Sequence, residues 1–186
     1  MVTTVETGYK MTAEELLRLP DDGWRYELVK GELLKMVPAG PRHGKITMRL
    51  GVLLDQHARQ HGLGTVYAAE TGFRLQRDPD TVRAPDVAFV RQERIPPEGE
   101  PEGYWELSPD LAVEVVSPTD SAAHIQAKVQ EYLEAGTRLV WVVYPRTQTV
   151  VVYRPSGEAL VLGEEDMLTG EDVLPGFACR VGDIFD

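Results

Sequence analysis

The feature that most constrains this sequence is a short apolar run that carries one carboxylate. The run from Leu111 to Ser117 reads LAVEVVS, a length and composition typical of a β-strand. Because its apolarity is nearly continuous rather than alternating, we expect a central strand that is buried on both faces of a sheet. Glu114 lies in the middle of this run, and a buried carboxylate without a partner is costly. The fold must therefore give Glu114 a cation, a proton or an opening to a cleft.

The patterns on either side of this strand predict an α/β domain around a mixed sheet. Helical periodicity extends from about His43 to His61, and strands are expected at residues 65–75, 83–90, 111–117 and 138–144, with a helix at 121–135. The resulting order is αβββαβ. A short helix with a capping box at Thr12 and a hairpin at 26–29 and 32–37 precede this core, and a second hairpin at 148–153 and 159–162 follows it.

Length and composition favour one domain. We expect residues 1–186 to form it, with 12–40 as an N-terminal helix and hairpin, 43–145 as the core and 146–186 as a C-terminal extension. The sequence shows no secretory signal and no apolar run of the ~20 residues that span a bilayer, so we expect no membrane partner and, by default, a cytoplasmic location. Cys179 is the only cysteine, which excludes disulfides and cysteine-built zinc sites within the chain.

The net charge of −11 argues against a nucleic-acid-binding face that covers the whole chain. The charge is uneven, however, because residues 1–95 carry a net +1 and residues 96–186 a net −12. Arg42, His43, Lys45 and Arg49 cluster at the start of the first core helix. This cluster is either a contact surface for a polyanion or simply a solvated helix start.

Two carboxylates on neighbouring strands suggest a cation site. Glu114 shares a strand face with Ala112, and Asp86 shares one with Ala88, so a small residue leaves space beside each acid. Carboxylate oxygens are ligands for a hard cation such as Mg²⁺, which keeps several of its waters. Asp86 and Glu114 are therefore candidate metal ligands.

Lys128 is the second indication of chemistry. It lies three residues after Ile125 and four before Tyr132, on the border of the apolar face of its helix, and from there it could extend toward the sheet. An ammonium near a metal site can orient water or stabilise developing negative charge.

Structural explanations exist for each of these residues. Asp86 follows a proline and could begin a turn, Glu114 could pair with an arginine, and Lys128 could extend to solvent. His43 and His124 are expected as surface or capping residues, because the four histidines show no metal-binding spacing.

Several segments together resemble the PD-(D/E)XK nuclease superfamily, and more narrowly its Uma-type restriction-endonuclease family. The segments that carry the resemblance are RYELVKGELLKM, PRHGKI, APDVAFV, AVEVVSP, AAHIQAKVQEYLEAGTRLVWVV and LPGFACRVGDIF. They cover about residues 12–186. The resemblance implies a restriction-endonuclease-like core, a helix and three strands followed by a helix and a fourth strand, which agrees with the αβββαβ order.

The resemblance also implies roles for individual residues. Asp86 and Glu114 match the two acids of the motif, which bind Mg²⁺, with Mn²⁺ as a substitute, together with the backbone carbonyl of Val116. Val116 stands where the motif has its lysine, and Lys128 matches the lysine that the Uma-type pattern places on the following helix. Glu27 is the first candidate for a further acid of the site.

Glu32 is the second candidate for that acid. The resulting hypothesis is a Mg²⁺-dependent endonuclease that hydrolyses phosphodiester bonds in DNA, with Lys128, Glu114, Asp86 and Glu27 as its catalytic residues. A homodimer is expected, because cutting two strands often requires two sites. The alternatives are a nuclease-fold interaction protein with weak or no activity and a phosphodiesterase acting on RNA.

Overall fold

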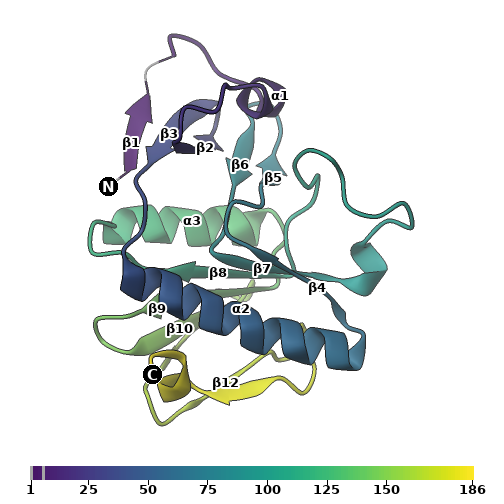
Figure 1. Cartoon of the computed structure of the whole chain (residues 1–186), viewed down its shortest axis with the longest axis vertical. Coiled ribbons are helices and arrows are strands. Elements are labelled where there is room, and N and C mark those ends of the chain that lie inside the picture. The colour runs from purple at the N-terminus through teal and green to yellow at the C-terminus, as the bar shows by residue number, and fades with distance from the viewer. Residues whose placement is uncertain (1, 6) are drawn as a thin grey trace.

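A six-stranded mixed sheet forms the centre of the structure, a computed structural model that describes residues 2–5 and 7–186 (Figure 1). Its strand order is β11-β10-β9-β8-β7-β4. The strands are β4 (Gly64–Ala68), β7 (Val87–Arg91), β8 (Leu111–Val115), β9 (Leu139–Tyr144), β10 (Thr149–Tyr153) and β11 (Ala159–Leu162). Only β8 and β9 are parallel, and helix α3 (Ala122–Glu134) connects them. The core order α2-β4-β7-β8-α3-β9 confirms the expected αβββαβ arrangement.

A second sheet of five strands comes mostly from the N-terminal part of the chain. Its order is β1-β3-β2-β6-β5. The strands are β1 (Val2–Val5), β2 (Arg25–Val29), β3 (Glu32–Met36), β5 (Phe73–Gln76) and β6 (Thr81–Arg83). Strands β2 and β3 are the expected hairpin, and helix α1 (Ala13–Leu17) begins with the expected capping box at Thr12. Figure 1 shows this N-terminal sheet above the central sheet, beyond α3.

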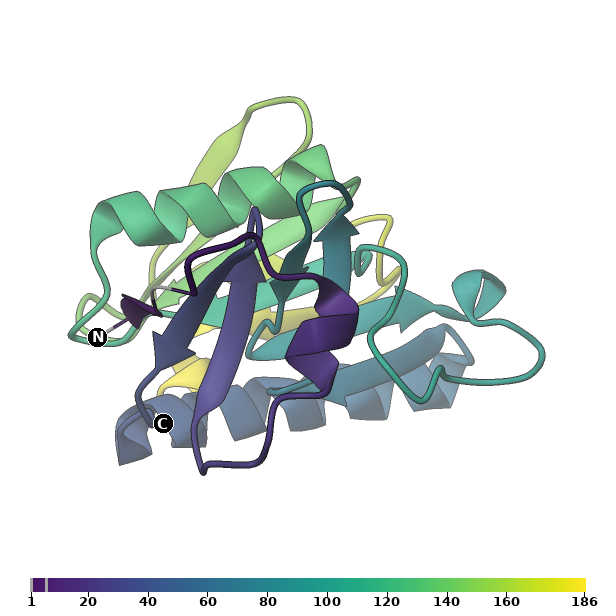
Figure 2. The ribbon, with the colours of Figure 1, turned by 90° about the horizontal axis from the view of Figure 1, so that it is seen from above.

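Two helices cover opposite faces of the central sheet, as the two views show (Figures 1 and 2). Helix α2 (Pro41–His61) begins with a proline, whose missing N–H is not needed in the first turn, and ends at Gly62 in a left-handed conformation. Because side chains alternate along a strand, Leu111, Val113 and Val115 of β8 pack in the α2 cluster. Ala112 packs with α3 instead. All five residues of β8 are buried, which confirms a central strand covered on both faces.

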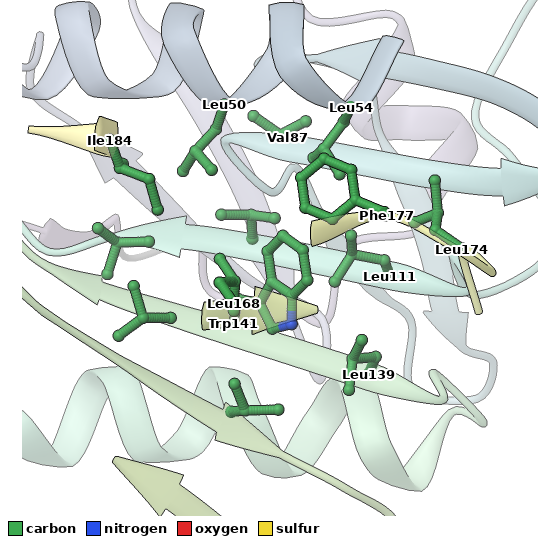
Figure 3. Packing of buried hydrophobic residues seen from close by; sticks show 14 of the residues in the cluster. Leu50, Leu54, Val87, Leu111, Leu139, Trp141, Leu168, Leu174, Phe177 and Ile184 are labelled. Carbon is green, nitrogen blue, oxygen red and sulfur yellow. The ribbon is translucent and has the colours of Figure 1, made fainter. Parts of the chain in front are cut away.

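The largest core lies between α2 and the sheet and extends into the C-terminal segment (Figure 3). Leu50 and Leu54 of α2 meet Trp141 of β9, and Phe177 packs its ring against that indole, with centroids 5.9 Å apart. The C-terminal segment contains β12 (Met167–Thr169), β13 (Ala178–Arg180) and the 3-10 helix η2 (Val181–Ile184). Another 3-10 helix, η1 (Gln92–Arg94), follows β7. The C-terminal residues therefore complete the main core.

The prediction of one strand at 65–75 and one at 83–90 is wrong, because each of these segments is divided between the two sheets. Residues 65–75 contain β4 of the central sheet and β5 of the N-terminal sheet, separated by a turn before Gly72. Residues 83–90 divide in the same way between β6 and β7, at Ala84 and Pro85. Proline cannot donate a ladder hydrogen bond, which favours a break at this position. Between β4 and β7 the chain thus crosses twice between the sheets.

Gly64 at the start of β4 is tightly packed, and Gly51 in α2 provides a comparison where there is open space. A Cβ on Gly64 would lie 2.1 Å from the Val90 carbonyl oxygen, and Gly64 has a φ of +147°. Gly51 lies in the middle of α2, and a Cβ there would meet nothing within 4 Å. We therefore expect Gly64→Ala to destabilise the protein by at least about 2 kcal/mol and Gly51→Ala to stabilise it by about 0.5–1 kcal/mol. Urea denaturation measures both, and equal effects of the two substitutions would contradict the packing described.

Candidate active site

The candidate site lies where the chain passes from the N-terminal sheet to the central sheet. Arg83 ends β6, and three residues later Asp86 stands just before β7. Strands β7 and β8 pair antiparallel with Val87 opposite Val113, so the same register places Asp86 opposite Glu114. The two acids were expected on neighbouring strands. They lie opposite each other as that expectation requires, although Asp86 stands one residue before β7 and not within it.

Glu114 is buried, with 5% of its surface exposed, and both its carboxylate oxygens accept hydrogen bonds. Lys128 Nζ donates to Oε2 at 2.8 Å, and the Tyr132 hydroxyl donates to Oε1 at 2.8 Å. Both donors come from α3, one helical turn apart, which is the spacing that puts them on one face. The cation of Glu114 is thus a lysine rather than the arginine considered from sequence.

Lys128 is the centre of a buried ionic cluster. Its ammonium nitrogen lies 2.8 Å from Glu114 and 3.3 Å from Glu27 of β2. Glu27 also accepts a hydrogen bond from Arg83 Nη1 at 2.6 Å, and Arg83 Nε in turn donates to Glu131 of α3 at 2.6 Å. Lys128 is only 4% exposed, so its side chain does not extend to solvent. The cluster joins the N-terminal sheet, the central sheet and α3.

Asp86 sits at the more open edge of the same cluster. Its Oδ2 accepts a hydrogen bond from the Val115 backbone N–H at 2.7 Å and contacts His43 Nε2 at 3.0 Å. His43 was expected at the surface or in a cap, but α2 brings its imidazole to Asp86, where it is only 15% exposed. Sequence spacing could not reveal this contact, because 43 residues separate the two side chains.

The pKa values of the two buried acids, Glu114 and Glu27, shift in opposite directions. Burial raises the pKa of Glu114 to about 7, and the nearby Asp86 and Glu27 act in the same direction against Lys128. Burial also acts to raise the pKa of Glu27, but Lys128 and Arg83 outweigh it and lower that pKa to about 2. The described cluster contains four carboxylates and two permanent cations. Its charge balance leaves room for a divalent cation.

The pKa of His43 is also shifted by the nearby carboxylates. Burial alone would lower its pKa, but the hydrogen bond and charge of Asp86 raise it overall. His124 differs, because burial and the nearby Lys128 and Arg83 lower its pKa. The backbone N–H of His124 donates to the N-cap Ser121, as a capping role predicts, yet its ring Nε2 is buried without a hydrogen-bond partner in the described part of the chain.

The remaining sequence candidates divide between the site and the surface. Glu27 belongs to the cluster, whereas Glu32 is exposed and its carboxylate pairs with Lys10 at 2.7 Å. Val116 follows Glu114 past the end of β8, and its N–H bonds to the Val143 carbonyl at 2.9 Å. Glu27 is therefore the better placed of the two candidate acids.

The basic residues at the start of α2 have different partners. Lys45 donates to the carbonyls of Phe185 and Asp186 at 3.0 and 2.8 Å, and Arg49 donates to the Asp183 carbonyl at 3.0 Å. Both side chains thus hold the C-terminal segment. Arg42 remains exposed.

A cavity of about 410 Å³ opens beside the cluster. Its lining includes the carboxylates of Glu27, Asp86 and Glu114 and the imidazoles of His43 and His124. Within residues 2–5 and 7–186, no group of three or more His, Cys, Asp and Glu side chains is arranged to hold a metal ion. Mg²⁺, however, is often held by one or two carboxylates together with waters and substrate phosphates. The residues present fit that ion, because Asp86 and Glu114 offer two carboxylates and the cluster has two more carboxylates than cations.

Comparison with known proteins identifies the family of this chain. A model of the Uma2 family, described as "Putative restriction endonuclease", matches residues 13–182. The chain belongs to the Uma2 family. A search of curated proteins gave no match. None of the helices in the described residues has the length and apolarity needed to cross a membrane.

The fold of this Uma2 protein is shared with a solved structure from Anabaena variabilis, described as a "putative nuclease belonging to DUF820". The two chains are 22% identical, and the match has a TM-score of 0.83 and covers 94% of this chain and 97% of the other. The fold class expected from the sequence, a nuclease-like α/β core, is confirmed.

The low pKa of Glu27 predicts a specific loss of stability in acid. A carboxyl whose folded pKa is depressed contributes stability above its unfolded pKa and loses it as the pH falls through the folded pKa. With a shift from 4.5 to about 2, the stability difference between wild type and Glu27→Gln should shrink by about 2 kcal/mol between pH 6 and pH 3. Urea denaturation at both pH values measures this change.

The exposed Glu32 provides a matched control for this prediction. Glu32→Gln removes a carboxylate from the same hairpin. Lys10 also lowers the pKa of Glu32, but solvent screens this exposed pair, so the difference from wild type should change much less over that pH range. A Glu27→Gln difference that is independent of pH would show that Glu27 is not held as a carboxylate by Lys128 and Arg83.

Proposed function

We propose that this Uma2 protein is a Mg²⁺-dependent nuclease that hydrolyses phosphodiester bonds in DNA. The observation that carries the proposal is the pair of acids, Asp86 and Glu114, held opposite each other beside a buried lysine in a cluster with excess negative charge. Membership of a restriction-endonuclease family and a nuclease-like fold support the same reaction class.

In this proposal Asp86 and Glu114 bind the metal, with the backbone carbonyl of Val116 as a third ligand. When bound, Mg²⁺ supplies Lewis acidity toward water and toward the scissile phosphate. The two hydrogen bonds on Glu114 fix the orientation of its carboxylate, and each oxygen retains a lone pair for a cation. The bond from Val115 N–H fixes Asp86 in the same way.

Lys128 is the proposed electrostatic catalyst. Its ammonium has three protons, and its neighbours Glu114 and Glu27 engage two of them, so one is left to donate to a phosphoryl oxygen. A preorganised cation in a buried site stabilises the charge that develops on phosphate without reorganising solvent. Glu27 was expected to complete the metal shell. Its contacts with Lys128 and Arg83 favour a role in positioning the lysine.

Activity should depend on both the metal and the lysine. We expect cleavage of a panel of DNA substrates in Mg²⁺ or Mn²⁺, and none in excess EDTA. Lys128→Met and Glu114→Gln should each lower the cleavage rate by about 10²–10³-fold, because each removes one charged group from the site. Removing one partner of a buried pair costs about 3–5 kcal/mol, so circular dichroism must first show that each variant is folded.

Lys10→Met and Glu98→Gln are matched controls, since both residues are exposed and neither lines the cavity. Both should cleave like wild type. Unchanged cleavage by folded Lys128→Met or Glu114→Gln would refute the assignment of the site. RNA strands of the same sequence test the alternative substrate, and absence of cleavage in every arm would favour an interaction protein.

Metal binding can be tested without any substrate. Calorimetric titration with Mn²⁺ should show binding by the wild type, and Asp86→Asn should weaken it at least tenfold, because an amide is a weaker ligand than a carboxylate. Glu32→Gln serves as the control and should bind like wild type. Equal Mn²⁺ affinity for Asp86→Asn and wild type would place the metal elsewhere.

The expected homodimer remains a proposal. A dimer would bring two sites onto one DNA molecule, and sedimentation of a monomer at micromolar concentration would contradict it.

A further inference from the structure

The depth of the candidate site restricts what can reach it. Glu27, Glu114 and Lys128 are 3%, 5% and 4% exposed, and the side chain of Asp86 is 17% exposed. A phosphate that meets these groups must enter the cavity rather than rest on a surface. A DNA duplex is stiff, with a persistence length of about 50 nm, so bending one backbone into the cavity costs deformation energy. An unpaired strand can turn at each nucleotide.

The cavity has the size of a small ligand. Its volume of about 410 Å³ falls within the range of pockets that enclose drug-sized molecules, about the size of one nucleotide. Its walls come from several parts of the chain. They include the N-terminal hairpin, residues 38–40 before α2, and residues 117–120 before α3. A cavity of this volume can enclose one nucleotide.

Aromatic side chains line the same cavity. Trp24, just before β2, is 43% exposed, and the Lys35 ammonium lies 3.7 Å from the centroid of its ring. Tyr104 lines the cavity as well, and its ring occupies the place that a side chain on residue 72 would fill, so Gly72 makes room for it. Proteins that bind single strands combine such stacking surfaces with nearby cations. Because the Lys35 ammonium covers one face of the Trp24 ring, a base would have to stack on the opposite face.

The charges of the cavity do not suit a duplex. Each lysine and arginine that lines it is already paired: Arg25 with Glu70, Arg83 with Glu27 and Glu131, and Lys128 with Glu114. Duplex binding relies largely on cations that neutralise many phosphates, and this chain has a net charge of −11. Stacking of bases depends far less on net charge. It can therefore supply affinity that electrostatics here cannot.

We propose that the cavity binds an unpaired strand of DNA, with one base stacked on Trp24 and the adjacent phosphate directed to Asp86, Glu114 and Lys128. The inference rests on the proposed nuclease function and narrows its substrate to single-stranded DNA, including overhangs and flaps. We expect an intact duplex to bind this site less tightly than an unpaired strand.

Binding of labelled oligonucleotides tests this substrate class. A fluorescein-labelled 12-nucleotide strand and the matching duplex are titrated with the full chain, with Ca²⁺ in place of Mg²⁺. Anisotropy should show the single strand binding at least tenfold more tightly. Trp24→Ala should weaken its binding about tenfold, which is the scale of one lost stacking contact. Trp24→Phe keeps an aromatic ring and should restore most of that loss.

Tyr9→Ala is the matched control, because Tyr9 is an exposed aromatic, 56% accessible, that does not line the cavity. Its affinity should equal that of the wild type. Equal or tighter binding of the duplex, or wild-type affinity in Trp24→Ala, would overturn the inference. Tenfold preference for an RNA strand of the same sequence would overturn the assignment to DNA.

Cleavage of the same oligonucleotides in Mg²⁺ separates this inference from the proposed function. Preferential cutting of the duplex would leave the nuclease function standing and refute the substrate class. Absence of cleavage in any metal, with single-strand binding that still depends on Trp24, would refute the nuclease function and retain the binding site.

Discussion

The buried ammonium of Lys128 is the interaction on which the rest of the structure depends. It lies between Glu114 of the central sheet and Glu27 of the N-terminal sheet, so one charge links two sheets that share no strand. A charge in such a place is stable only when its partners are close and well oriented. Arg83 extends the network by holding Glu27 and Glu131 together. The position of α3, the N-terminal sheet and the candidate site are therefore coupled.

This coupling explains why the site lies at a junction rather than within one sheet. The chain leaves the N-terminal sheet at Arg83 and enters the central sheet after Asp86, so two residues three positions apart supply a structural cation and a candidate metal ligand. Pro85 stands between them and ends the ladder on both sides. The acids that result are close together and short of positive charge, which is the condition that favours a divalent cation.

The alternation of side chains along β8 gives one face to the apolar core and the other to the candidate site. The odd-numbered residues pack into the core against α2, and the even-numbered Ala112 and Glu114 face α3. The small side chain of Ala112 leaves room beside Glu114, and α3 fills that room with Lys128 and Tyr132. A strand that is almost wholly apolar can therefore carry one carboxylate without loss of its central place in the sheet.

Much of the fold and part of the site could be predicted from local pattern. The apolar run of β8, the periodicity of α2 and α3 and the hairpin turn at Gly31 are local signals, and they determined the αβββαβ order by themselves. The border position of Lys128 on its helix allowed it to extend either toward the sheet or to solvent, and the structure places it in the buried cluster. Tertiary structure alone decided that residues 65–75 and 83–90 divide between two sheets, because a strand pattern does not specify its neighbour. It also decided the contacts of His43 with Asp86 and of Glu27 with Lys128, since hydrogen bonds between residues far apart in sequence leave no local pattern.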